Sequence, residues 1–343
     1  MVLNRRRSLI LKAVVEEHVR SGQPVGSGFI VRQYGLGVSP ATVRHELVRL
    51  EDGGYVTQPH TSAGRTPSDL GYRFYVDHLM QPPERLPPEG GLIGRYLSHY
   101  GRDVRNAVKA TARFLAEVTS YVALVLTPDS TSHRLRQIHL LPLATDQALA
   151  VVVLAGGAVQ HRLISFPGGM ERGELEQLSS QLQAALAGCT AADLPAAVGR
   201  LWRSSLARYG EALESATGAL RDVLEAGQDN EERLYLGGTS NILNLPEFQD
   251  VERLRGILSL LERDAAIFEI LERRSAEQGV SVTIGRENPV DEIQLCSLVT
   301  VPYRSPGGGR GIIGLLGPTR MDYGRVVALL KVAGQHLDET SAG

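Results

Sequence analysis

The segment from Gln81 to Gly91 (QPPERLPPEGG) constrains the fold of this chain more than any other stretch of its sequence. It holds four prolines and two glycines in eleven residues. Because proline fixes φ and lacks a backbone N–H, neither a long helix nor a central strand is expected to run through it. We interpret residues 81–100 as a linker and lead-in that separates an N-terminal domain, residues 1–80, from a larger body.

Charge is also distributed unevenly about this boundary. The whole chain has a formal net charge of −2, but residues 1–80 carry +3 and the remaining residues carry −5. A modestly basic head on an acidic body argues against a protein that coats nucleic acid along its whole length. It indicates that any nucleic-acid contact is local and N-terminal.

The N-terminal domain has the pattern of three helices. Residues 4–20 are amphipathic, residues 29–34 form a short second helix, and a glycine-containing turn over residues 35–38 precedes the third. Ser39 is placed to cap the third helix, and Pro40 occupies its first position, where a missing N–H is tolerated. Three helices with a tight turn before the third predict a helix-turn-helix arrangement.

The two faces of the third helix differ in chemistry. At about 100° per residue, Val43, Leu47 and Leu50 share one side, which predicts the buried stripe. The other side offers hydroxyl, imidazole and guanidinium groups among small side chains, as suits a helix in the major groove of DNA. The residues expected to contact DNA from this helix are Ser39, Thr42, Arg44, His45 and Arg49. The alternative is plain three-helix packing with solvated arginines.

Residues 53–67 follow the third helix and predict a wing. The segment reads as two short strands joined by a small polar tip. We expect His60 and Arg65 to lie at this tip, where they reach the sugar-phosphate backbone or the minor groove.

The body alternates between helical and strand patterns. Strands are predicted over residues 121–127, 134–143, 148–154 and 159–166, and again over 280–285, 294–302 and 311–317. Between these groups, residues 171–230 look helical, with a leucine stripe at 175, 178, 182 and 186. We therefore predict an α+β multidomain protein in which a helical stretch is inserted into one sheet domain.

A single reading helix covers only a few base pairs, so specific recognition usually needs two copies of it. We assign dimerisation to residues 171–230, which have no catalytic pattern. The alternative is that their leucine stripes only pack internally.

Other classes of protein lack support in the sequence. Cys189 and Cys296 are far apart, and no Cys/His cluster suggests a metal site. The GxGxxG match at residues 309–314 precedes a predicted strand rather than opening a helix, as a dinucleotide site requires. No Walker A or GxSxG motif occurs. We expect no enzyme activity, cofactor or metal, no signal peptide and no membrane span, and therefore a cytoplasmic protein.

Several segments together resemble the heat-inducible transcription repressor HrcA family. They are YGLGVSPATVR (34–44), LEDGGY (50–55), QPHTSAGRTP (58–67), GYRFYVD (71–77), LGGTSN (236–241), IGRE (284–287) and GLLGPTRMDY (314–323). The resemblance implies a winged-helix DNA-binding domain over residues 1–80 and a GAF-like domain in two parts, 101–170 and 231–343. It also implies that residues 171–230 are an inserted, mainly helical dimerising domain.

The same resemblance implies a function. The chain would repress heat-shock (chaperone) operons by binding an inverted-repeat operator in double-stranded DNA as a homodimer, with activity modulated by temperature and by the GroEL chaperonin. Many family members have Asn-Asp where this chain has His45-Glu46, which leaves the operator preference at that position open. The alternative is a ligand-responsive winged-helix regulator whose GAF-like domain senses a small molecule.

Overall fold

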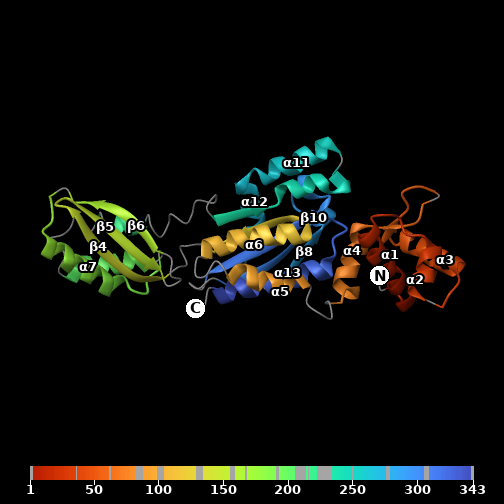
Figure 1. Cartoon of the computed structure of the whole chain (residues 1–343), viewed down its shortest axis with the longest axis horizontal. Helices are drawn as coiled ribbons and strands as arrows, with labels where there is room; N and C mark the ends of the chain where they lie inside the picture. Colours follow the sequence, from red (N-terminus) through yellow and green to blue (C-terminus); the bar gives the residue numbers. More distant parts are fainter. Residues whose placement is uncertain are drawn as a thin grey trace.

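The structure is a computed structural model in which three units follow one another along the long axis (Figure 1). We call them the head (residues 3–80), the central unit (88–127 and 233–340) and the inserted unit (134–221). The structure describes the whole chain except residues 1–2, 36, 62, 82–87, 99–103, 129–133, 155–158, 167, 191–192, 205–213, 215, 222–232, 249, 276–278, 305–308 and 341–343.

The head consists of helices and a two-stranded wing. Helix α1 begins where the Asn4 side chain accepts a hydrogen bond from the Arg7 backbone N–H, and it ends at Gly22, whose φ of 68° closes the last turn. Strands β1 and β2 pair in antiparallel fashion, and a π-helical turn, η1, extends the last helix. The elements are α1 (Arg5–Ser21), α2 (Ser27–Tyr34), α3 (Pro40–Asp52), β1 (Val56–Thr57), β2 (Thr66–Pro67), α4 (Asp69–Phe74) and η1 (Tyr75–Leu79).

The central unit is a five-stranded antiparallel sheet of order β7-β3-β10-β9-β8, with helices on both faces. Side chains alternate along β10, so Ile313 and Leu315 face one core and Ile312 and Leu316 face the other. Helices α5 (Pro88–Ser98), α6 (Val104–Thr119) and α13 (Tyr323–Thr340) cover the first face, and α11 (Val251–Leu261) and α12 (Asp264–Ser275) cover the second. The strands are β3 (Val122–Leu126), β7 (Leu234–Gly237), β8 (Ser281–Ile284), β9 (Cys296–Arg304) and β10 (Arg310–Pro318).

Short 3-10 turns connect several of these elements: η6 (Thr239–Asn244), η7 (Pro246–Phe248), η8 (Gly285–Glu287) and η9 (Asp291–Ile293). The GxGxxG match at residues 309–314 enters strand β10 and opens no helix, as predicted. Mixed helix and sheet content confirms the α+β class.

The predicted linker is shorter than expected. Residues 82–87 lie outside the described residues, but Pro88 already begins α5, so the segment up to residue 98 is helical. Proline is tolerated at the start of a helix, and Gly94 lets α5 approach α13 closely, because a Cβ there would lie 2.8 Å from the His336 ring. The linker and lead-in predicted over residues 81–100 therefore includes helix α5.

The inserted unit contains three strands in addition to the predicted helical stretch. Strands β4, β5 and β6 form their own antiparallel sheet, and no described strand pair joins it to the central sheet. The leucine stripe of α7 packs inside the unit against this sheet. The elements are β4 (Leu135–Ala144), β5 (Gln147–Leu154), β6 (Val159–Ser165), α7 (Arg172–Leu186) and α8 (Leu194–Ser204).

The proposed boundary at residue 171 therefore falls inside the inserted unit. The chain leaves the central sheet at Thr127 and returns at Arg233, and the Thr127 N–H donates to the Arg233 carbonyl oxygen at 2.8 Å. A residue pattern of period two identifies a strand but not the sheet that it joins, which explains the error. The described residues of 171–230 are helical, as predicted, but they share one core with strands β4, β5 and β6.

The head contacts the central unit through α4. Arg286 donates its backbone N–H to the Asp69 carboxylate at 3.1 Å. Gly285 makes this approach possible, because its φ is 56° and a Cβ would lie 2.2 Å from an Asp69 oxygen. The rings of Tyr72 and Tyr323 lie 6.0 Å apart across the same contact.

Candidate nucleic-acid interface

The N-terminus of α3 is organised by hydroxyl groups. Ser39 caps the helix as predicted: its Oγ accepts a hydrogen bond from the Thr42 backbone N–H at 3.2 Å. The same oxygen lies 3.0 Å from Thr42 Oγ1. Both predicted contact residues thus sit at the first turn, with their hydroxyls hydrogen-bonded to each other.

The outward face of α3 presents polar side chains beside the exposed Val48, as the helical periodicity predicts. Arg44, His45 and Arg49 are exposed, and Thr42 is half-buried. The Arg49 Nε–H donates to His45 Nε2 at 3.2 Å. With Nε2 accepting, a neutral His45 ring presents its Nδ1–H as a donor. The opposite face, formed by Val43, Leu47 and Leu50, is buried in the head.

Glu46 lies on the same helix next to His45, and its sequence pattern did not predict its partners. It is buried beside α1, where its carboxylate accepts a hydrogen bond from Arg7 Nε at 2.8 Å and lies 3.9 Å from Arg6 Nη1. The hydrogen bond from Arg7 holds the pKa of Glu46 below its ordinary value. Its position one turn after the buried Val43 is the signal in the sequence. The ion pair joins α3 to α1.

The tip of the wing is held by side-chain to backbone hydrogen bonds. Gln58 donates from Nε2 to the carbonyl oxygens of Thr61 (2.9 Å) and Ala63 (3.0 Å). The Ala63 N–H donates to the His60 carbonyl, and the His60 side chain is exposed. His60 therefore lies at the tip, as predicted.

Arg65 does not lie free at this tip. Its side chain is 13% exposed, and its Nη2 pairs with Glu51 Oε2 of α3 at 2.7 Å. Its backbone exchanges two hydrogen bonds with Val25, of 2.8 and 2.9 Å. Gly64 permits this approach, because a Cβ there would lie 2.4 Å from the Val25 carbonyl. Arg65 was expected at the wing tip, but in the structure its side chain turns toward α3; its contact with DNA stays a prediction.

Among the described residues, no group of three His, Cys, Asp or Glu side chains is placed to hold a metal ion. Cys296 is buried, and burial raises the pKa of its thiol to about 12, which disfavours the reactive thiolate. No helix in the described ranges has the length and apolar character of a membrane span.

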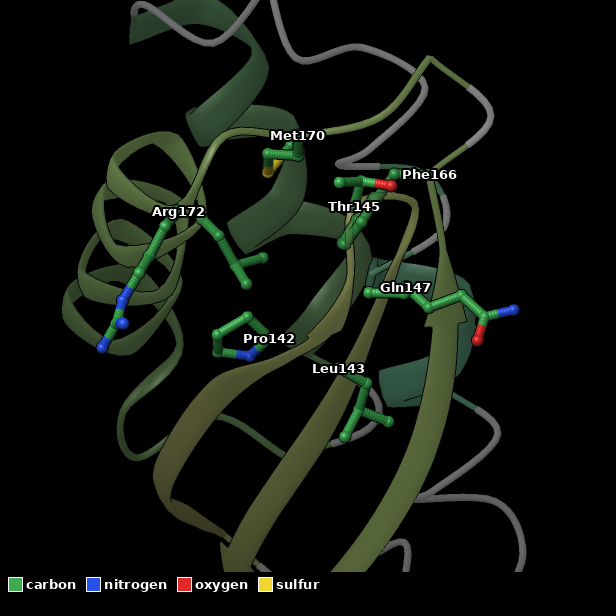
Figure 2. Close-up of a pocket in the computed structure, with 9 residues that line it drawn as sticks. Pro142, Leu143, Thr145, Gln147, Phe166, Met170 and Arg172 are labelled. Atoms are coloured by element: carbon green, nitrogen blue, oxygen red, sulfur yellow. The ribbon is translucent and has the colours of Figure 1, made fainter.

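One cavity of about 200 Å³ lies in the inserted unit, between the β4–β5 turn and α7. Figure 2 shows Met170 and Phe166 on its loop side and Pro142 on its strand side. Its volume is below the roughly 300 Å³ at which small-molecule sites usually begin. Arg172 at its edge is already hydrogen-bonded to Glu176 at 3.2 Å. This cavity is not in the central unit, where the small-molecule alternative requires one.

Known proteins resemble the chain over nearly its full length. The family model of the HrcA protein C-terminal domain matches residues 105–327. A heat-inducible transcription repressor HrcA of Moorella thermoacetica is 39% identical over 341 residues, covering 99% of this chain and 98% of the relative. One of Pelotomaculum thermopropionicum is 38% identical over 339 residues, covering 99% and 97%. A crystal structure of a hypothetical protein shares the fold, with a TM-score of 0.65, 21% identity and 99% of each chain covered.

These similarities, together with the winged head, define a transcription regulator and not an enzyme. The chain belongs to the HrcA family of heat-inducible transcription repressors. The resemblance noted in the sequence is thereby confirmed.

Proposed function

We propose that the chain represses heat-shock (chaperone) operons by binding an inverted-repeat operator in double-stranded DNA as a homodimer. The observation that carries this proposal is the exposed polar face of α3, with Arg44, His45 and Arg49 outward and Glu46 fixed behind it. A rigid helix with donors on its outer face suits direct readout of base edges in the major groove. The bound dimer would repress transcription by blocking access to the promoter. This function places the protein in the cytoplasm.

The contacts divide by their place in the head. Arg44 and His45 lie on the outer face of α3 and are proposed to reach base edges. Ser39 and Thr42, at the first turn, approach the same groove, where the N-terminal residues of a reading helix lie deepest. Arg49 and His60 are proposed to contact the backbone from the end of α3 and from the wing.

We assign the dimer contact to the outer sheet face of the inserted unit, on the side of the sheet away from α7. Its cross-strand rows are Leu141–Leu149–Leu163, His139–Val151–His161 and Val153–Val159. Leu141, Leu163 and Val159 are 48%, 54% and 62% exposed. An apolar face of this kind on one subunit usually marks an interface.

A second copy of the chain is the occupant that the function requires, because each chain supplies one reading helix and an inverted repeat has two half-sites. This assignment replaces the predicted one, since the leucines of α7 are buried within the unit. Leu220, farther along the same segment, is buried in this core as well, and residues 213, 223 and 224 lie outside the described residues.

We propose that operator occupancy depends on temperature through the folding stability of the repressor and, from the family resemblance, through a chaperonin. Only the folded pair binds the operator, so a domain stability of about 5–15 kcal/mol makes occupancy sensitive to temperature. A GroEL-type chaperonin that refolds the repressor would then increase the amount of active repressor whenever free chaperonin is available. This step rests on the family resemblance.

Gel-shift titration against an inverted-repeat promoter fragment tests the proposal. The control fragment carries the same composition with one half-site scrambled. We expect the intact repeat to bind at least tenfold more tightly, and chaperonin to raise the active fraction of repressor after heating. Equal binding to both fragments at several salt concentrations would overturn the proposal.

A further inference from the structure

Arg65 joins three separate parts of the head. Its backbone pairs with Val25 in the loop between α1 and α2, with hydrogen bonds of 2.8 and 2.9 Å. Its side chain crosses to the last turn of α3, where Nη2 meets Glu51 Oε2 at 2.7 Å. Arg65 also leads directly into β2, the second strand of the wing. One residue therefore ties the wing to the recognition helix and to the loop before α2.

Arg65 is held against the head even though one of its donor groups is unsatisfied there. Its Nε is buried and has no hydrogen-bond acceptor among the described residues. Leaving a charged donor group unsatisfied in this way costs free energy, and an arginine on a solvated tip avoids that cost. The backbone is equally constrained, because Gly64 lies against the Val25 carbonyl. The ion pair with Glu51 and the backbone bridge to Val25, and not contact with water, therefore hold the guanidinium in place.

We infer that Arg65 is a positioning residue for operator binding: through its ion pair with Glu51 it sets the angle of the wing on α3, and it does not itself touch DNA. The expected effect on operator binding rests on the proposed function. The ion pair and the backbone bridge are present in the protein without DNA, so their effect on the wing can be measured separately from DNA binding.

The salt dependence of operator binding distinguishes a positioning role of Arg65 from a direct contact with phosphate. Arg65 and Glu51 together are neutral, so the pair releases no counterions on binding. A direct phosphate contact by Arg65 would add about 0.9 to the steepness of the salt dependence of log affinity. It would also bring the Glu51 carboxylate toward the DNA backbone, where removing that carboxylate would tighten binding.

The test uses the full-length chain with the variants Arg65→Ala, Glu51→Ala, the double variant and Arg65→Lys. Asp52→Ala is the matched control, because Asp52 is exposed, adjacent to Glu51 and carries the same charge. Operator affinity is measured over a range of salt concentrations, and hydroxyl-radical footprints separate protection under the wing from protection under α3. Hydrogen exchange of the amides of residues 57–66 is measured without DNA.

We expect Arg65→Ala and Glu51→Ala each to weaken operator binding roughly tenfold, and the double variant to be no weaker than either, as coupled residues behave. The salt slope stays at the wild-type value. Protection under the wing is lost while protection under α3 remains, a pattern that general unfolding would not give. Arg65→Lys restores part of the affinity, and Asp52→Ala changes neither footprint nor exchange.

Two outcomes overturn the inference. A salt slope reduced by about one in Arg65→Ala, together with tighter binding by Glu51→Ala than by Asp52→Ala, would identify a phosphate contact. Equal exchange of the wing amides in all variants would show that the ion pair does not hold the wing. This second readout stands even if the wild-type chain ignores the operator, which would refute the proposed function instead.

Discussion

Arg73 in α4 of the head donates from Nε to a carboxylate oxygen of Glu287 in the central unit at 2.8 Å, although 214 positions separate the two residues. The same guanidinium donates from Nη2 to the Val282 carbonyl oxygen at 2.6 Å. Burial disfavours the charge of Glu287, but hydrogen bonds from Arg73 and the Ile284 N–H outweigh it, so the pKa of Glu287 lies below its ordinary value. The head and the central unit are therefore joined by a specific charged contact.

Replacing Arg73 tests the strength of this contact. We expect Arg73→Ala to lower the free energy of unfolding by about 1–2 kcal/mol, because a partly exposed ion pair and a hydrogen bond to a carbonyl are lost. Urea unfolding followed by circular dichroism measures the change. Arg172→Ala, which removes an exposed pair within α7, is the control and should change stability by less than about 0.5 kcal/mol. Equal effects of the two variants would contradict the prediction.

His18 makes the stability of the head depend on pH. Burial disfavours its charged form and Arg320 repels that form, so the pKa of His18 lies below the ordinary value of 6.5. Its Nδ1 lies 2.8 Å from the Tyr72 hydroxyl. Because the folded-state pKa is lower than the unfolded one, this contribution is fully present above pH 6.5 and is lost as pH falls below it.

The measurement is the free energy of unfolding between pH 5 and 7.5 for wild type and His18→Gln. We expect the variant to lose part of the decline that wild type shows below pH 6.5. His60→Gln, at the exposed wing tip, is the control and should keep the wild-type profile. A decline of the same steepness in wild type and His18→Gln would refute a role for His18.

Gly285 is expected to tolerate no side chain. In Gly285→Ala the new Cβ meets the Asp69 carboxylate and the backbone keeps a φ of 56°, so we expect the melting temperature to fall by several degrees. Gly173→Ala in α7 is the control, because a Cβ there meets nothing within 4 Å. This change should leave the melting temperature equal or slightly higher, since alanine favours the helix. A stabilising Gly285→Ala would contradict the described contact.

The outer sheet face predicts the oligomeric state. We expect Leu163→Asp to convert a dimer into monomers, because a buried carboxylate facing its symmetry mate is costly. Light scattering at several protein concentrations measures the mass. Leu243→Asp changes an equally exposed leucine of η6 in the central unit and should leave the dimer intact. Persistent dimers in Leu163→Asp would place the interface elsewhere.

Arg44 is predicted to carry base discrimination. We expect Arg44→Ala to weaken binding to the intact operator by about 1–3 kcal/mol while non-specific binding changes little, if the guanidinium reads a guanine through two hydrogen bonds. Competition binding with single-base operator variants measures the loss of specificity. Arg255→Ala on α11 removes the same charge from the central unit and should bind as wild type. Uniform weakening on all sequences would assign Arg44 to phosphate.

The local chemistry of α3 was predictable from the sequence, and its tertiary partners were not. Capping by Ser39 and burial of Val43 depend on residues within a turn or two, and such short-range rules are legible in sequence. Arg65 was misplaced because the ion pair that turns it inward involves Glu51, fourteen positions earlier. Glu46 was missed because a charged residue is normally assigned to the surface unless its partner is known.

The sequence also could not predict which sheet each strand joins. The strands at residues 135–165 were recognised by their composition, but hydrogen bonding to a particular neighbour is a long-range property. The contact of Arg73 with Glu287 has the same character, since no local pattern relates the two positions. The sequence segments GYRFYVD and IGRE therefore appeared as unrelated motifs, whereas α4 and η8 bring them together.

The long axis of the molecule places α3 at one end and the sheet of β4, β5 and β6 at the other, with the five-stranded sheet between them (Figure 1). If two chains meet at the far end, the span between their reading helices is determined by the shape of everything in the middle. DNA repeats its grooves every 34–36 Å, so a small change in that span shifts one helix off its half-site. The central unit would then set the distance between the two helices, and a substitution that changes its shape is expected to weaken recognition without altering any surface that meets DNA or the other subunit.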